Sequence, residues 1–184
     1  MKKTIAMGVV PAAVLALASL ASAQTSAVPA SAVKVAAADQ TFALAATRDG
    51  LAEVELGKLA REHGSIDGVK EFAAKMVEDH TKANEELAAW ITSRGLLPPT
   101  EPGPEHKATA KRLSGLSGPA FDKAYAAHMV ADHKKAVAAF TKASKTAKDA
   151  DLQAWSAKTL LTLQAHLDHS EKLSKDVAAT KAAP

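Results

Sequence analysis

The 184-residue sequence contains no cysteine. It therefore forms no disulfide, carries no lipidated cysteine of the kind that anchors bacterial lipoproteins, and cannot attach haem through a CxxCH motif. Nucleophilic catalysis lacks its usual signatures, because there is neither a thiol nor a Gly-x-Ser-x-Gly turn. There is also no Gly-x-x-x-x-Gly-Lys run that would bind a phosphate. The sequence thus leaves the question of an enzyme open and favours a protein without catalytic activity.

Aromatic side chains are few, and positive and negative charges are nearly balanced. Phe, Trp and Tyr make up 4% of the sequence, and 23 Lys and Arg stand against 20 Asp and Glu, which gives a net charge of +3. Residues 1–23 contain two lysines and no acid, so without them the net charge falls by two, to +1. A protein that binds nucleic acid typically has a basic stripe and aromatic stacking groups. The sequence therefore predicts no nucleic-acid partner.

Long apolar runs are confined to the beginning of the chain. Lys2 and Lys3 precede an apolar stretch at 5–20, and residues 21–23 read Ala-Ser-Ala, the small-x-small pattern that signal peptidases cut. We therefore predict a signal peptide over residues 1–23 and secretion across the inner membrane, to a periplasmic or outer-membrane-associated location. No later stretch approaches the ~20 apolar residues that a spanning helix needs, so no transmembrane segment is expected in the mature chain.

The remaining residues divide by composition and by helical period. Residues 24–38 are small and without pattern, which predicts a flexible leader. Apolar residues then recur at helical spacing in four long segments, at 39–63, 65–95, 119–148 and 151–177. Residues 96–118 are rich in Pro and Gly and admit only a short helix, at 105–113. We predict an all-α fold, with a four-helix bundle over 39–178 that has a long loop between its second and third helices, and a disordered tail at 179–184.

One short sequence occurs twice in the chain. Residues 76–83 read MVEDHTKA and residues 129–136 read MVADHKKA, and each copy places a histidine, His80 or His133, on the apolar stripe of a predicted helix. Two copies are too few for a helical array. We therefore interpret the repeat as two similar core helices, each of which brings a histidine into the bundle.

The depth of a residue in the bundle can be estimated by counting from the turns, at ~1.5 Å per residue. His80 and Asp49 lie at nearly equal distances along the chain from the turn between the first two helices. His133 and His166 lie in the same way on either side of the turn between the last two. One side chain from each long helix is thus predicted to reach the middle of the bundle, and Glu53, one turn from Asp49, is also within reach.

Three imidazoles and a carboxylate from four helices can bind a divalent metal such as zinc, iron, copper or manganese. The same side chains can instead hydrogen-bond to acidic residues in a buried polar layer that fixes the register of the helices. The sequence leaves both interpretations open and the metal unidentified. The predicted ligands are His80, His133, His166 and either Glu53 or Asp49.

The other polar residues near this level are weaker candidates. His169 shares a helix face with His166 and offers a second arrangement on the last helix. Three further histidines are predicted to be solvated: His63, His106 and His128. Asp79 and Asp132 each precede a histidine of the repeat and point ~100° away from it, so they are expected to support the site or to face solvent.

Four segments of the chain resemble a known family. They read GLAEVELGKLA at 50–60, VKEFAAKMVEDHTKANEEL at 69–87, LSGLSGPAFDKAYAAHMVADHKKAV at 113–137 and TLLTLQAHL at 159–167. From residue 39 to residue 173 the chain is similar to the exported bacterial proteins grouped as domain of unknown function 4142. The resemblance implies a ferritin-like four-helix domain, in proteins described as outer-membrane or periplasmic, without a settled biochemical activity.

Ferritin-like di-iron enzymes carry Glu-x-x-His motifs, and this chain departs from that pattern. The residues three positions before the central histidines are apolar: Val77, Val130 and Leu163. A bridged di-iron site is therefore disfavoured. We expect an exported four-helix domain of unknown biochemical activity, a structural or interaction protein of the cell envelope whose partner is unknown. The alternative is a periplasmic metal-binding protein with a mononuclear, histidine-rich site in the middle of the bundle, linked to metal or oxidative stress.

Overall fold

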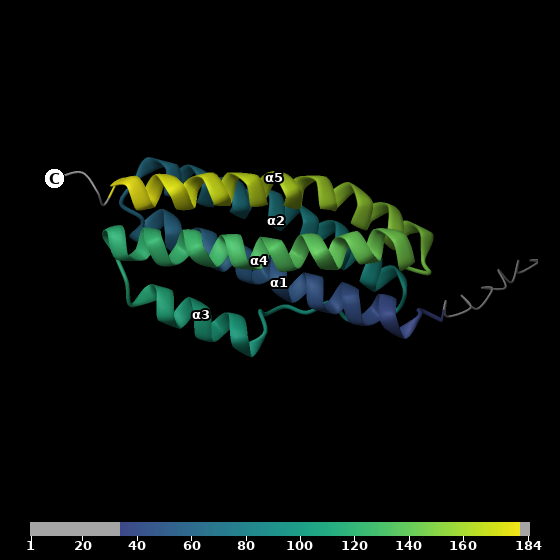
Figure 1. The fold of residues 1–184 in the computed structure, drawn as a ribbon. Helices are drawn as coiled ribbons and strands as arrows, with labels where there is room; N and C mark the ends of the chain where they lie inside the picture. The colour runs from purple at the N-terminus through teal and green to yellow at the C-terminus, as the bar shows by residue number, and fades with distance from the viewer. Residues whose placement is uncertain (1–33, 181–184) are drawn as a thin grey trace, which may run out of the picture. The chain divides into compact units, whose positions relative to one another are not determined.

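The computed structural model describes residues 34–180, which form five α-helices and no strand (Figure 1). The helices are α1 (Ala37–His63), α2 (Asp67–Ser93), α3 (Pro104–Ser114), α4 (Gly118–Thr146) and α5 (Ala150–Thr180). The predicted fold class is confirmed: four long helices form the bundle, and a short helix lies in the connection between the second and the third.

Parts of the predicted domain division lie outside the described residues. These parts are the signal peptide at 1–23, most of the leader at 24–38 and most of the tail at 179–184. α1 begins slightly before the predicted boundary at 39, and α5 continues slightly beyond the predicted boundary at 178. Within the described part of the chain, no helix combines the length and the apolar character needed to cross a membrane.

Two helical hairpins make up the bundle. α1 packs along α2, and α4 packs along α5, each pair joined by a short turn and running antiparallel (Figure 1). Residues 94–117 connect the hairpins and contain α3, which runs back along the outside of α1 and α4. α2 and α4 consequently run in the same direction. A bundle with one such long crossover has the connectivity of ferritin-like folds.

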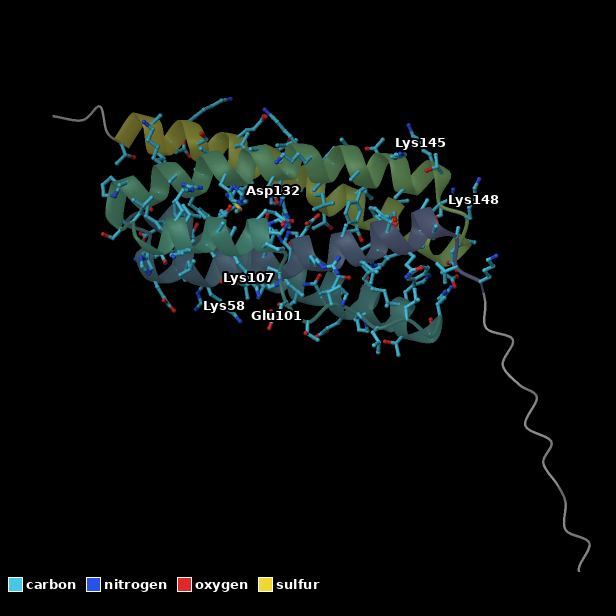
Figure 2. The ribbon with its side chains drawn as sticks, turned by 90° about the horizontal axis from the view of Figure 1, so that it is seen from below. Lys58, Glu101, Lys107, Asp132, Lys145 and Lys148 are labelled. Atoms are coloured by element: carbon cyan, nitrogen blue, oxygen red, sulfur yellow. The ribbon has the colours of Figure 1, made fainter. Side chains whose placement is uncertain are left out.

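The buried apolar side chains form two clusters, one toward each end of the bundle. The cluster toward the α1–α2 turn includes Leu56, Phe72, Met76, Tyr125 and Met129. The cluster toward the α4–α5 turn includes Leu87, Ile91, Phe140, Leu152 and Leu163. Burying a large apolar side chain contributes ~1.5–3 kcal/mol, so each cluster stabilises its own end. Charged side chains such as Lys58 and Lys145 cover the outside (Figure 2). The level between the two clusters is where the histidines of α2, α4 and α5 lie.

A buried carboxylate fixes the bundle at the end of the α4–α5 turn. Asp39, near the start of α1, accepts hydrogen bonds from the backbone amides of Lys148 and Asp149 (2.9 and 2.8 Å). The Asp149 side chain accepts hydrogen bonds from the Leu152 amide and from the Trp90 indole. The turn between α4 and α5 is thereby tied to both helices of the other hairpin.

Asp122 of α4 fixes the opposite end of the bundle, at the turn between α1 and α2. Its carboxylate accepts hydrogen bonds from the Ser65 amide (3.0 Å) and from the Ser65 hydroxyl, in the turn between α1 and α2. The His63 ring, at the end of α1, donates from Nδ1 to the carbonyl oxygen of Leu116 (2.7 Å). Because both ends are held in this way, the helices cannot slide past one another, and the heights of the central histidines are fixed.

Gly57 marks a close approach of α1 to α2. A Cβ atom there would lie 2.8 Å from Val77 Cγ2 and 3.0 Å from the carbonyl oxygen of Ala73. Alanine normally favours a helix over glycine by up to ~1 kcal/mol, but this carbonyl belongs to the backbone of α2 and cannot turn aside. We expect Gly57→Ala to lower the free energy of unfolding by ~1–3 kcal/mol, measured by urea denaturation.

Gly68→Ala is the matched control for this substitution. A Cβ atom at Gly68 would meet only Leu173 Cδ1, at an ordinary 3.6 Å. This variant should be neutral or more stable by up to ~1 kcal/mol. If both variants were stabilised equally, α1 and α2 would not be in tight contact at Gly57.

Candidate metal centre

The structure brings together His80 of α2, His133 of α4 and His166 of α5. One potential ligand atom from each ring lies within 4.8 Å of the other two. The ring centroids are 5.8 Å apart for His80 and His133, and 5.4 Å apart for each pair that includes His166. His133 and His166 are buried and His80 is half-buried, so the cluster lies inside the bundle.

Two of the three imidazoles are oriented by a hydrogen bond that one ring nitrogen makes to a neighbouring group. His133 donates from Nδ1 to the carbonyl oxygen of Met129 (2.9 Å), and His166 donates from Nε2 to Oδ2 of Asp79 (2.8 Å). A carbonyl and a carboxylate can only accept, so these contacts fix which nitrogen carries the hydrogen. The other nitrogen of each ring is left with a free lone pair. A carboxylate that holds a histidine in this manner is a common partner of metal-binding imidazoles.

Within residues 34–180, each of the three rings has a buried nitrogen without a hydrogen-bond partner. These atoms are Nε2 of His80, Nε2 of His133 and Nδ1 of His166. Buried polar atoms in folded proteins almost always have a partner, so three such atoms within one cluster call for an explanation. In His133 and His166 the unpartnered nitrogen is the one that bears the lone pair. The arrangement thus offers nitrogen donors to a group that lies between the rings.

Burial keeps the three imidazoles neutral. It lowers the pKa of His80 to about 3 and the pKa of His133 to about 4, and the neighbouring imidazoles lower both values further because a charge on one ring opposes a charge on the next. Burial also lowers the pKa of His166, although the hydrogen bond to Asp79 opposes this effect. Neutral imidazole is the form that binds metal ions. The rings are therefore ready to act as ligands at neutral pH without first losing a proton.

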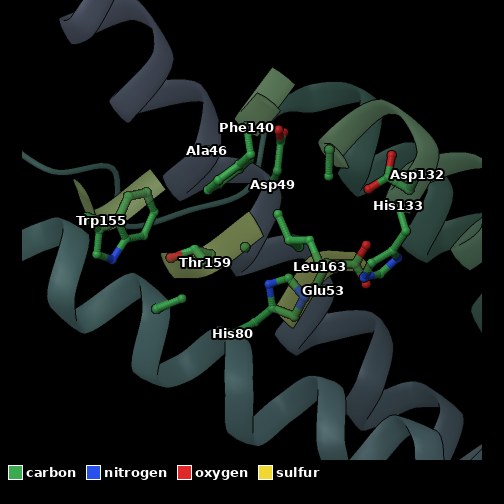
Figure 3. Close-up of a pocket in the computed structure, with 13 residues that line it drawn as sticks. Ala46, Asp49, Glu53, His80, Asp132, His133, Phe140, Trp155, Thr159 and Leu163 are labelled. Atoms are coloured by element: carbon green, nitrogen blue, oxygen red, sulfur yellow. The ribbon is translucent and has the colours of Figure 1, made fainter. Parts of the chain in front are cut away.

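Glu53 of α1 lies near this cluster, in the lining of an internal cavity of about 40 Å³ that His80 and His133 also line (Figure 3). The side chain is buried, and its Oε2 atom has no hydrogen-bond partner in the described part of the chain. Burial raises the pKa of Glu53 well above its usual value, and the carboxylates of Asp132 and Asp49 raise it further. Glu53 lies outside the group of ligand atoms that meet within 4.8 Å, so its role as a ligand stays a prediction.

Asp49 also lies outside the histidine cluster, although the count from the turns placed it at the same height. Its carboxylate is about half exposed and accepts a hydrogen bond from Nε2 of His106, on α3 (2.8 Å). This hydrogen bond raises the pKa of His106. The prediction that His106 is solvated is wrong, because its side chain is buried on the face of α3 that packs against α1. The helix that covers this side of the bundle thus engages the carboxylate of Asp49.

The remaining histidines do not take part in the cluster. His63 and His128 are half-buried rather than solvated, and burial lowers the pKa of His128. His169 is exposed and packs against Phe72, with ring centroids 4.9 Å apart. The cluster therefore contains His166 but not His169, so the alternative in which these two residues of α5 act together is not the arrangement that the structure shows.

Asp79 supports the site, which is one of the two roles expected from the sequence. Its carboxylate reaches across to His166 on α5 and also pairs with Lys75 (2.8 Å). Although partial burial would raise the pKa of Asp79, the hydrogen bonds from Lys75 and His166 lower it. Asp79 is therefore an ionised acceptor that holds His166 in place.

Comparisons with known proteins agree with this fold. A sequence model of the family described as "Domain of unknown function (DUF4142)" matches residues 24–173. None of the curated proteins matches the chain.

Solved structures of other helical proteins are similar to it at low sequence identity. A DUF305 protein from Streptomyces coelicolor superposes with a TM-score of 0.67 at 15% identity, over 77% of this chain and 92% of that one. A DUF305 fragment from Deinococcus radiodurans gives 0.69 at 15% identity, over 77% and 98%. CopM in its Cu(II)-bound form gives 0.64 at 14% identity, over 75% and 96%. At these identities the likeness concerns the fold alone.

Proposed function

The chain belongs to the DUF4142 family, and we propose that it is an exported protein that binds one late transition-metal ion, copper or zinc, through His80, His133 and His166. The observation that carries this proposal is a cluster of three imidazoles in which each ring offers a potential ligand atom within 4.8 Å of the others and each ring also has a buried nitrogen without a hydrogen-bond partner among the described residues. A structural polar layer, the role that the sequence favoured, would be expected to satisfy these nitrogens with acidic side chains. For this reason we propose metal binding as the main function and the structural role as the alternative.

The chemistry of the ligands limits the metal. Neutral imidazoles suit zinc, copper and other late divalent ions, whereas calcium and magnesium require oxygen ligands. Two nitrogens bound to one such ion lie ~3.4 Å apart, because each metal–nitrogen bond is ~2.0–2.1 Å long. Ring nitrogens that lie within 4.8 Å of one another reach that separation by small side-chain rotations. Copper binds most tightly among the divalent ions of this series, and one protein of similar fold, CopM, is described in a Cu(II)-bound form.

The site has room for a fourth ligand. A cavity needs ~10–15 Å³ to hold a water molecule, and the space of about 40 Å³ beside His80 and His133 exceeds this. We propose Glu53 as the source of an oxygen ligand, because it lines the same cavity and its Oε2 atom has no hydrogen-bond partner within residues 34–180. A bound ion would also offset the cost of burying Glu53 in its ionised form.

Titration of purified, metal-free protein with Cu(II) and Zn(II) tests the proposal. We expect one ion per chain by elemental analysis, and a gain of ~2.7 kcal/mol in the free energy of unfolding when the free metal is at 100 times its dissociation constant. His80→Gln and His133→Gln should each lose both effects. His169→Gln, on the exposed side of α5, is the matched control and should keep them. Wild-type protein that stays metal-free after exposure to both ions would refute the proposal.

A further inference from the structure

An outer hollow on the surface leads toward the internal cavity of the metal centre. It lies between α1, α3 and α4, has a volume of about 270 Å³ and is lined in part by Glu105 and His106. The outer hollow and the internal cavity share five lining residues: Ala46, Asp49, Asp132, Ala136 and Phe140. Figure 3 shows Asp49 and Asp132 among the residues that surround the same space as His80, Glu53 and His133. Asp49 and Asp132 thus border both spaces.

The charges along this path attract a cation. Asp49, Glu105 and Asp132 line the outer hollow, against a single lysine, Lys135. Within residues 34–180, Asp132 forms no ion pair with lysine or arginine, and the only side chain that hydrogen-bonds to Asp49 is that of His106. A cleft lined by charges of one sign raises the local concentration of the opposite ion.

Glu53 provides an independent indication that a ligand passes here. It lies inward of Asp49 and Asp132, is only 3% exposed, and faces the internal cavity with an Oε2 atom that has no hydrogen-bond partner. An acidic surface patch would not by itself need such a group. Asp49 and Asp132, then Glu53, and then the imidazoles thus place side chains that can bind a metal at the surface, along the cavity and in the cluster.

The opposite side of the bundle also touches the internal cavity, but its charges are neutralised. A smaller hollow between α2 and α5, of about 120 Å³, shares Ala83 and Thr159 with the cavity. Of the carboxylates that line it, Asp79 is paired with Lys75 (2.8 Å), and Glu86 is paired with Lys158 (3.0 Å). This side therefore has little attraction for a cation.

We propose that metal cations reach the three-histidine site through the outer hollow between α1, α3 and α4, with Asp49 and Asp132 as transient ligands on the way in. This inference rests on the proposed metal-binding function. Passage requires the contact between Asp49 and His106 to open, which makes α3 a cover over the path. Asp49 and Asp132 then affect the rate at which the site fills more than the affinity of the filled site.

Stopped-flow mixing of metal-free protein with Cu(II) tests this route. Trp155 lines the internal cavity, so quenching of tryptophan fluorescence reports arrival of the ion. We expect Asp49→Asn to fill at least ~5-fold more slowly than wild type, with the slowing reduced at high salt. The dissociation constant, measured by competition with a chelator, should stay within about threefold of wild type. Asp49→Asn/Asp132→Asn should be slower still.

Glu86→Gln is the matched control, because it removes a negative charge from the α2–α5 hollow while its amide oxygen can still accept the hydrogen bond from the indole of Trp155. It should fill at the wild-type rate. If wild type binds Cu(II) but Asp49→Asn fills as fast, or Glu86→Gln is slowed as much, the route is wrong and the proposed function stands. If Asp49→Asn instead loses affinity with an unchanged filling rate, Asp49 is a permanent ligand and the route is equally overturned. If wild type binds no ion, the proposed function itself fails.

Discussion

Replacing His133 by leucine is expected to make the metal-free protein more stable, by ~1–3 kcal/mol. The ring is 1% exposed, and its Nε2 atom is buried without a partner, so the wild-type fold carries the cost of desolvating that atom. Leucine is similar in size and has no polar group. The carbonyl of Met129 loses the hydrogen bond from the ring but remains within the backbone ladder of α4. Urea denaturation of both proteins in the presence of a chelator measures the difference.

The same variant should lose the stabilisation that metal gives to the wild type. At 1,000 times the dissociation constant, that loss amounts to ~4.1 kcal/mol and exceeds the gain expected without metal, so the order of stability of the two proteins reverses when metal is added. His169→Leu is the control, because His169 is exposed and outside the cluster, and it should shift neither value by more than ~0.5 kcal/mol. A metal-free His133→Leu that is less stable than wild type by more than ~1 kcal/mol would instead show that the imidazole supports the core, as the structural interpretation requires.

This reversal follows from how the stability of the domain is distributed. The two apolar clusters and the buried carboxylates Asp39 and Asp122 hold the helices at both ends, so the level between them can carry polar groups that do not stabilise the fold. Functional sites commonly lower stability in this manner, because their groups are arranged for a ligand rather than for one another. At the level of the histidines, the metal-free protein is therefore less stable than it would be with apolar side chains there.

The sequence predicted the fold and the meeting of the three histidines for a simple reason. Helical period identifies which residues face inward, and short turns make height along a hairpin countable from the chain alone. The repeated MVxDH segment marked His80 and His133, and the turn between α4 and α5 set His166 at the height of His133. Helical period and distance from a short turn both depend only on residues that are close together in the chain, so they can be read from the sequence.

The surroundings of the histidines could not be predicted in the same way. Asp49 has the expected height, but α3 packs over that side of the bundle and His106 engages the carboxylate. Asp79 was expected to support the site or to face solvent, but the period of α2 could not show that its partner would be His166 on α5. Both differences depend on where a loop segment packs and on how two hairpins are rotated against each other. Neither quantity is contained in the period of a single helix.

Acid should destabilise the metal-free protein through the same histidines. In the folded state, burial lowers the pKa of His133 to about 4 and that of His80 to about 3, below the value of ~6.5 for an unfolded chain. The unfolded chain therefore binds protons first, and stability that is fully present above pH ~6.5 is lost as the pH falls toward 4. For His133 alone, the loss between pH 7.5 and pH 4.5 is on the order of 2–3 kcal/mol, since each pKa unit corresponds to ~1.4 kcal/mol.

Because surface carboxylates also titrate in this range, the prediction concerns the difference between wild type and His133→Leu. The advantage of the leucine variant should grow by on the order of 2–3 kcal/mol between pH 7.5 and pH 4.5, as measured by urea denaturation at each pH. Glu53 acts with the opposite sign: burial raises its pKa, so its contribution is fully present below its unfolded pKa and is lost as the pH rises. Since both proteins contain Glu53, its effect largely cancels in the difference. A difference that stays constant with pH would mean that His133 is not held neutral by burial, and the ring would then have to face water rather than the cavity.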